Sequence, residues 1–298
     1  MNNRTFFKIN AFGFALLKEI RRYWRGLKFT SGFHRVVMEK CGLKKDVTIT
    51  LRDGVLTRFG TLYWGLVNIK YLKGSYGVND EKLCLSLPRY SLQLFLTSLK
   101  DLYIVGEVFG DEVYRPLANA HLQERTVVDI GSFIGISSIY FALQGAKVLA
   151  YEVLPVHYYF SLLNLRANNL MDRITIYNNA VGGRNRKIAV PLGHHDYSYS
   201  IYKSIPEEND VKYVDVITLE DIIEKNNINE IHLLKMDCEG SEYEIFKTIN
   251  ANTLQRINEL ILEFHGSAAP IVEKLRKNDF CVVKLGRTIR AYNKYFSV

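Results

Sequence analysis

A regular alternation of short apolar strands with amphipathic helices begins at Thr126 and continues through the C-terminal half of the sequence. Such an alternation is typical of a parallel sheet that is covered by helices on both faces. The 298 residues leave room for one large α/β domain and a smaller appendage. The expected strands cover residues 126–130, 147–151, 173–177, 232–237, 257–264, 280–284 and 289–295.

Three of the intervening helices have recognisable first turns. The helix after residues 147–151 begins near Pro155, which is a favourable residue in a first turn. Two later helices start with capping-box patterns, Thr218 with Asp221 and Ser241 with Glu244. One apolar face is expected on the Pro155 helix, made of Val156, Phe160, Leu163, Ala167 and Leu170.

The first 120 residues have a different character. Apolar residues recur at helical spacing between Ile9 and Leu27 with basic residues among them, which predicts a basic amphipathic helix. Residues 47–70 alternate in the manner of a hairpin around the turn dipeptide Asp53-Gly54. We therefore divide the chain into an N-terminal basic helix and α+β cap at residues 1–120 and an α/β domain at residues 121–298.

The positive charge of the chain belongs to its N-terminal segment. Residues 1–52 hold 12 Lys/Arg and 3 Asp/Glu, a net of +9, so the other residues hold 27 against 28, a net of −1. This distribution gives little support for nucleic-acid binding by the α/β domain. The basic helix could instead lie on an anionic membrane surface as a peripheral contact, or pack on its own domain.

Two further observations bear on the cellular compartment in which the protein is expected. No apolar run reaches the length of a membrane-spanning helix, about 18 residues. The four cysteines are scattered without a C-x-x-C pair, which indicates reduced thiols. We therefore expect a cytoplasmic protein, with peripheral membrane contact as the alternative.

A glycine turn follows the first strand of the α/β domain, in the pattern Asp129-x-Gly131-x-x-x-Gly135. Glycines let the backbone approach a ligand, and the helix that follows offers free N–H groups. The spacing is not G-x-G-x-x-G, which argues against a nicotinamide enzyme. Glu152 ends the next strand, about 20 residues later, where it could accept hydrogen bonds from ribose hydroxyls. A purely structural turn and a solvated strand end are the alternatives.

Charged residues also end the strand at residues 232–237. Lys235, Asp237 and Glu239 follow buried leucines, where charges are costly unless they are paired or take part in chemistry. Ligands of open α/β sheets bind outside the carboxyl ends of the strands, so these side chains and the glycine turn should share one crevice. A structural Lys–Asp pair is the alternative.

The motifs together resemble the FkbM family of methyltransferases over roughly residues 105–295. The most distinctive of them is the K-x-D-x-E-G-x-E run from Lys235 to Glu242. Two departures are Val153, where the family usually has proline, and Ser132, which replaces a common alanine. The matching segments, in order, are VVDIGSFIGISSIYFA, the Glu152-x-x-Pro155 step, Asn164 with Asn168, NAVGG, TLEDI, KMDCEGSEYEIF and LEFHG.

The resemblance implies a Rossmann-like class I methyltransferase fold with a mostly parallel seven-stranded sheet. It also implies S-adenosyl-L-methionine as methyl donor and a hydroxyl of a sugar, glycan or small metabolite as acceptor. Asp237, Glu239 and His265 are candidates for the general base or for a divalent-metal site. The tyrosine-rich segment at residues 194–202 is expected to face the acceptor. The expected cofactor-binding residues are Asp129, Gly131, Ser132, Gly135, Glu152, Asn179 and Ala180.

Two other functions are weaker alternatives. A nucleic-acid N-methyltransferase should have a proline-aromatic motif after the fourth strand, where this chain has Asp-Cys-Glu-Gly. A catalytically inactive methyltransferase fold that binds a partner or a membrane is the non-enzymatic alternative. The cofactor positions are intact, which favours the enzyme.

Overall fold

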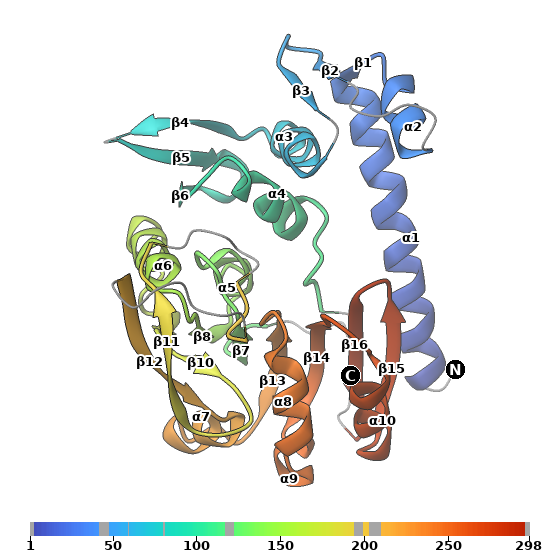
Figure 1. The fold of residues 1–298 in the computed structure, drawn as a ribbon. Coiled ribbons are helices and arrows are strands. Elements are labelled where there is room, and N and C mark those ends of the chain that lie inside the picture. The colour runs from blue at the N-terminus through green and yellow to red at the C-terminus, as the bar shows by residue number, and fades with distance from the viewer. Residues whose placement is uncertain are drawn as a thin grey trace. The chain divides into compact units, whose positions relative to one another are not determined.

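The computed structural model describes residues 3–41, 48–58, 60–79, 81–116, 122–193, 199–202 and 210–295, with side chains described from residue 16 onward. The contacts divide the chain into two compact units (Figure 1). Unit 1 comprises Met1–Phe12 with Pro116–Val298, and unit 2 comprises Gly13–Arg115.

Unit 1 is built on a seven-stranded sheet with the order β15-β16-β14-β13-β7-β8-β9. The five strands from β14 to β9 are parallel, and β16 runs antiparallel to both of its neighbours. Each predicted strand is present, and the class I methyltransferase fold is confirmed. The strands are β7 (Thr126–Ile130), β8 (Lys147–Tyr151), β9 (Ile174–Tyr177), β13 (Ile231–Met236), β14 (Ile257–Glu263), β15 (Phe280–Leu285) and β16 (Thr288–Asn293).

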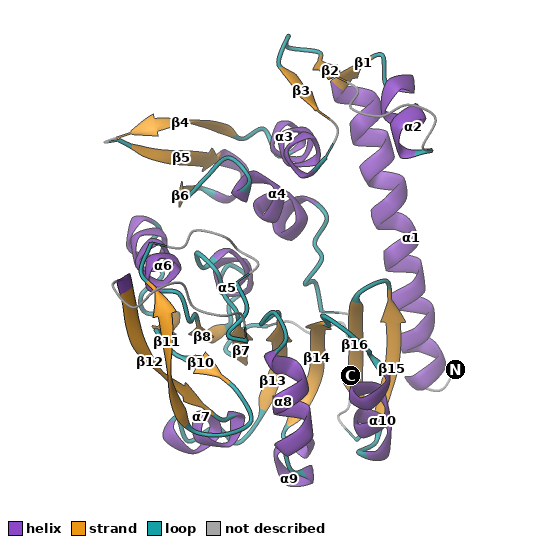
Figure 2. Cartoon of the chain, viewed as in Figure 1, coloured by secondary structure: helices purple, strands orange, loops and turns teal. Residues whose placement is uncertain are grey.

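Helices pack against this sheet, as Figure 2 shows by colour. Apolar residues of α7, α8 and α10 join β7, β13 and β14 in one large core cluster, whereas α5 contacts β7, β8 and β9. A smaller sheet, β10-β12-β11, precedes α7. The elements are α5 (Ile136–Ala142), α6 (Pro155–Ala167), β10 (Ala180–Val181), β11 (Arg186–Pro191), β12 (Val211–Ile217), α7 (Leu219–Lys225), α8 (Ser241–Thr248), α9 (Ala251–Gln255) and α10 (Ala269–Lys277).

One of the two predicted capping boxes forms. Thr218 and Asp221 cap α7 reciprocally. The second prediction is wrong, because α8 begins after Gly240, which has a φ of 114°, without a side-chain cap. The carboxylate of Glu244 binds Arg186 at 2.8 Å instead, and the Ser241 hydroxyl donates to the Cys238 carbonyl at 3.3 Å.

The buried face of α6 also differs from the prediction. It consists of His157, Ser161, Asn164 and Leu165, while Ala167 is exposed. Two of these polar side chains are buried because they satisfy backbone carbonyls of the glycine turn. Ser161 Oγ donates to the Phe133 carbonyl at 2.8 Å, and Asn164 Nδ2 donates to the Ile134 carbonyl at 2.9 Å. Hydrophobic periodicity cannot detect such a polar contact.

Unit 2 contains the predicted hairpin, β2–β3, around Asp53-Gly54. Residues 61–71, which we expected to continue the alternation, form a buried helix. The elements from the start of the chain to residue 110 are α1 (Asn3–Phe29), β1 (Thr30–Ser31), α2 (His34–Lys40), β2 (Thr48–Leu51), β3 (Leu56–Arg58), α3 (Thr61–Tyr71), β4 (Ser75–Asn79), β5 (Lys82–Leu87), η1 (Pro88–Tyr90), β6 (Leu92–Leu96), α4 (Asp101–Val105) and η2 (Gly106–Gly110).

A buried ion pair joins the two central strands of unit 1. Lys235 Nζ on β13 lies 3.1 Å from Asp129 Oδ1 on β7 and donates to the Gly131 carbonyl at 2.6 Å. Asp129 Oδ2 accepts from the hydroxyls of Ser137 and Ser138, both at 2.6 Å. Burial alone would lower the pKa of Lys235, but the carboxylates of Asp129 and Asp237 raise it, so the lysine stays charged.

We predict that Lys235→Met lowers the free energy of unfolding by about 3–5 kcal/mol, because Asp129 would be left as an uncompensated buried charge. Chemical denaturation measures this change. Lys277→Met is the matched control, since its pair with Glu273 is exposed; it should have little effect. Similar losses in both variants would contradict the prediction.

Candidate active site

The carboxyl ends of β14, β13, β7, β8 and β9 lie in that order along one edge of the sheet. Because these strands are parallel, the side chains that follow them line a common edge. The candidate residues are distributed as follows: His265 after β14, Asp237 and Glu239 after β13, Gly131, Ser132 and Gly135 after β7, Glu152 after β8, and Asn179 and Ala180 after β9.

The glycine turn is held closely by its own domain. A Cβ on Gly131, whose φ is +75°, would lie 1.8 Å from the Asp237 carbonyl oxygen, so only glycine fits there. Gly135 has a φ of +83°, and a Cβ on it would lie 3.5 Å from Ser161 Oγ of α6. The N–H groups of the turn itself are used internally: Gly131 and Ser132 donate to the Tyr151 carbonyl, and Gly135 donates to that of Ser132.

Glu152 connects the glycine turn to β8. Its two carboxylate oxygens accept the N–H groups of Phe133 and Leu154, each at 2.9 Å. The residue is 5% exposed, and His157 Nδ1 lies 3.7 Å from Oε1. Each carboxylate oxygen can accept a second hydrogen bond. Glu152 therefore organises the turn and keeps the capacity to bind a ligand hydroxyl.

Asp129 lies beneath the turn and is fully buried. Its oxygens contact Lys235 and the two serines of α5, so it supports the turn from below. Ser132 Oγ, in contrast, is buried without a hydrogen-bond partner among the described residues. A polar cofactor at the turn would give this hydroxyl a partner, so the residues present fit such a group.

After β9, Asn179 is half-buried and donates to the Asp215 carbonyl at 3.2 Å, while Ala180 is buried in β10. The neighbouring Asn178 is a residue whose role the sequence analysis missed. Its Nδ2 donates to the carbonyls of Glu152 at 2.9 Å and Val153 at 3.0 Å, and so ties the ends of β8 and β9 together. Asn178 directly precedes the motif NAVGG, but its partners could not be seen in the sequence.

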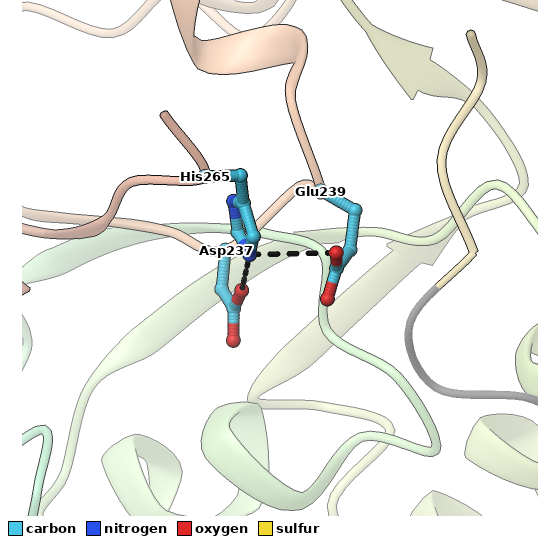
Figure 3. Close-up of side chains that lie close together, drawn as sticks. All are labelled: Asp237, Glu239 and His265. Carbon is cyan, nitrogen blue, oxygen red and sulfur yellow. Dashed lines mark ion pairs between the residues drawn. The ribbon is translucent and has the colours of Figure 1, made fainter. Parts of the chain in front are cut away.

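Asp237, Glu239 and His265 form a half-buried cluster, which we call the acid–histidine cluster (Figure 3). His265 Nε2 lies 3.4 Å from Glu239 Oε2 and 3.8 Å from Asp237 Oδ1. One ligand atom from each residue lies within 4.8 Å of the others. The structure thus brings together the three residues that we expected to act on the acceptor.

Glu242 orients the His265 ring of this cluster by binding its Nδ1 side. It is fully buried, and its Oε1 lies 2.9 Å from the His265 backbone nitrogen and 3.1 Å from Nδ1. Its Oε2 accepts the Gly240 N–H at 2.8 Å. The imidazole therefore presents Nε2 to Asp237 and Glu239. The sequence contained Glu242 only as part of the K-x-D-x-E-G-x-E run, without this role.

The carboxylates set the charge of the histidine. Burial alone would lower the pKa of His265, but Glu239 and Glu242 outweigh it and raise the pKa to about 10. His265 is consequently an imidazolium at neutral pH and cannot accept a proton, which leaves Asp237 and Glu239 as the candidate bases. Two carboxylates and an imidazole also suit a divalent cation, which would have to displace the proton from Nε2.

Part of the tyrosine-rich segment lies beside the cluster. A Cβ on Gly240 would be 3.6 Å from both Ser200 Oγ and Tyr202 Cδ2. Tyr202 is 55% exposed, and its hydroxyl donates to Glu244 at 2.7 Å. His194 and His195 lie outside the described residues.

The sequence signature of the methyltransferase FkbM domain matches residues 129–282, just over half of the 298-residue chain. The match includes the glycine turn, Glu152 and the acid–histidine cluster. The chain belongs to the FkbM methyltransferase family. It is an S-adenosylmethionine-dependent methyltransferase, as the resemblance implied.

Individual relatives of this FkbM-family chain are distant. The 31-O-demethyl-FK506 methyltransferase FkbM of Streptomyces tacrolimicus is 23% identical over 69% of this chain and 92% of its own length. Methyltransferase sdnD of Sordaria araneosa is 23% identical over 56% of this chain and 76% of its own. The N-terminal domain of human METTL16, solved in complex with SAH, aligns with a TM-score of 0.40 and 17% identity over 85% of this chain and 90% of that chain.

We predict a pH-dependent stabilisation by His265. Because its pKa rises from 6.5 to about 10 on folding, the charged ring stabilises the protein fully below about pH 6.5, and this contribution is lost as the pH rises towards 10. Chelator-treated native protein and His265→Gln should therefore differ most in free energy of unfolding below pH 6.5 and least near pH 10. A difference independent of pH across this window would refute the prediction.

Proposed function

We propose that this FkbM-family enzyme methylates a hydroxyl group of a sugar, glycan or small metabolite. The observation that carries the proposal is the contact between the two halves of the site. The Asp237 carbonyl packs on Gly131, so the acid–histidine cluster begins where the glycine turn begins. The cofactor half, over β7, β8 and β9, therefore adjoins an acidic half over β13 and β14.

The reaction needs few groups from the protein. When bound, S-adenosylmethionine supplies a methyl group on a sulfonium, and the acceptor oxygen forms a bond to that carbon as the sulfur–carbon bond breaks. The products are the methyl ether, S-adenosylhomocysteine and the proton of the hydroxyl. In this proposal Asp237 takes this proton, while His265 and Glu242 hold the carboxylates in position; His265 Nε2 lies 3.8 Å from Asp237 Oδ1. Positioning of this kind can lower the barrier substantially.

A small polar acceptor is supported by the surroundings of the cluster. The exposed Tyr202 beside Gly240 offers an aromatic ring and lies next to polar Ser200. The Streptomyces relative is named for an oxygen position of a small molecule. Incubation of the purified protein with labelled methyl donor and a cell extract tests the chemical class of the acceptor. Label in small metabolites or glycans supports the proposal, whereas label confined to nucleic acid, or cofactor binding without turnover, opposes it.

We predict that Glu152→Ala weakens cofactor binding about tenfold or more, because ribose hydroxyls would lose a charged acceptor worth about 1.5–3 kcal/mol. Calorimetric titration with S-adenosylhomocysteine measures this. Glu152→Ala also releases the Phe133 N–H, so Ser161→Ala is the control. It removes the bond from Ser161 to the Phe133 carbonyl and leaves the carboxylate in place. Equal losses in both variants would show that Glu152 acts only by holding the turn.

We predict that Asp237→Asn lowers turnover without weakening cofactor binding. The variant keeps the shape of the side chain and removes the charge that accepts a proton, so turnover should fall by roughly 100-fold or more. Its affinity for S-adenosylhomocysteine should match that of the native enzyme. Single-turnover assays with saturating cofactor measure the step. Normal turnover with lost cofactor affinity would reject the catalytic role of Asp237 and make Glu239 the next candidate for the general base.

The same assay separates a general base from a metal ligand. If Asp237 acts as the base, chelator treatment should leave the native turnover unchanged. Activity that is lost on chelation and restored by Mg²⁺ would show that the acid–histidine cluster holds a cation instead.

A further inference from the structure

Helix α1 exposes a stripe of large apolar side chains. Leu16, Leu17, Ile20, Trp24 and Leu27 are each between 52% and 57% exposed. Their spacing places them within an arc of about 100° on one side of the helix. A contiguous apolar surface of this kind on a soluble domain marks an interaction site. The opposite side of α1 is buried within unit 2, through Arg25 and Gly26.

The described basic residues of α1 fall into a group directed into unit 2, Lys18, Arg22 and Arg25, and an exposed group, Arg21 and Lys28. Lys18 Nζ lies 4.0 Å from Glu107 Oε1. Arg22 and Arg25 pair with Asp111 at 2.8 and 2.9 Å, and the Arg25 side chain is only 2% exposed. These two cations hold unit 2 together and are not available to a partner. Arg21 and Lys28 are exposed and border the stripe: Arg21 lies 3.8 Å from Glu112 but keeps 53% of its side chain exposed, and Lys28 Nζ lies 5.0 Å from the centre of the Trp24 ring. The surface therefore combines an apolar stripe with cations along its border.

Charge decides which occupant this surface fits. The exposed charges beside the stripe are the cations Arg21 and Lys28 and the acid Glu19, which lies 4.0 Å from Lys40, so the excess charge there is positive and two copies brought together through the stripe would repel each other. An anionic lipid surface accepts both features, because the apolar stripe enters the headgroup boundary and the border cations meet lipid phosphates or carboxylates. Among the described residues, no helix is long and apolar enough to cross a membrane. The helix is thus suited to lie on the surface.

We propose that α1 docks this enzyme on anionic membrane surfaces, with the stripe inserted and Arg21 and Lys28 directed at the headgroups. Trp24 would sit at the interface, where tryptophan combines an apolar ring with a polar N–H. This function goes beyond methyl transfer and is independent of the acceptor.

The full chain should bind vesicles of phosphatidylcholine mixed with phosphatidylserine and bind phosphatidylcholine vesicles far more weakly. Sedimentation measures binding, and tryptophan fluorescence reports insertion. The chain has two tryptophans, and Trp64 is only 7% exposed, so a blue shift on binding reports Trp24. Salt should weaken the interaction, because it screens the exposed cations.

Matched variants test the apolar stripe. The double variant Ile20→Ser, Trp24→Ser should lose vesicle partitioning by about tenfold or more, since it removes two inserting side chains. The control Leu56→Ser, Val78→Ser removes exposed apolar residues of β3 and β4, which are 67% and 75% exposed, and should bind like the native protein. All four residues are exposed, so both variants should fold.

A second pair of variants tests the border cations. Arg21→Glu with Lys28→Glu should weaken binding to the anionic vesicles by about tenfold or more. Lys100→Glu with Lys247→Glu makes the same change in net charge at other exposed positions and should weaken it much less. Equal losses in the two charge variants, or native binding by the stripe variant, would overturn the proposal. So would a native dimer that the stripe variant converts to a monomer, because the stripe would then face a second copy.

Discussion

The buried pair of Lys235 and Asp129 is the interaction on which the rest of the catalytic domain depends. It joins the two central strands of the sheet at the level where both of them end. Because Lys235 also binds the Gly131 carbonyl, the charge that stabilises the strands positions the glycine turn as well. Two serines of α5 complete the coordination of Asp129. A structural Lys–Asp pair was the alternative for the charged residues that end β13; Lys235 does form a structural pair, with Asp129 of β7, and this pair supports the proposed site.

The site is organised in successive layers of carboxylates. Asp129 is fully buried and supports the turn, Glu152 is nearly buried and binds backbone amides, and Glu242 is buried and fixes a histidine. Asp237 and Glu239 alone are half-exposed. The buried acids hold the geometry, and of these Glu152 keeps the capacity to accept from a ligand hydroxyl, whereas the half-exposed acids are open to a substrate. This difference in environment, rather than residue type, separates the supporting acids from the candidate base.

The sequence predicted the seven strands of the main sheet because strands buried on both faces read as apolar runs. It also predicted Asp237 and Glu239, since they directly follow such a run. It failed where a side chain is determined by a distant partner. Ser161 and Asn164 are buried in α6 because of carbonyls about 30 residues away in the glycine turn. Glu242 gains its role only when β14 is placed beside β13. Periodicity could not reveal these contacts.

The close approach of Gly131 to the Asp237 carbonyl has a consequence for how such an enzyme can change. No methyl group fits between them, so the glycine turn and the end of β13 cannot move independently of each other. A substitution that shifts the backbone of either segment displaces the other, so donor affinity and acceptor chemistry change together whenever the backbone moves at this contact. If the segment that carries Tyr202 faces the acceptor, as proposed, acceptor choice can vary there without disturbing this contact.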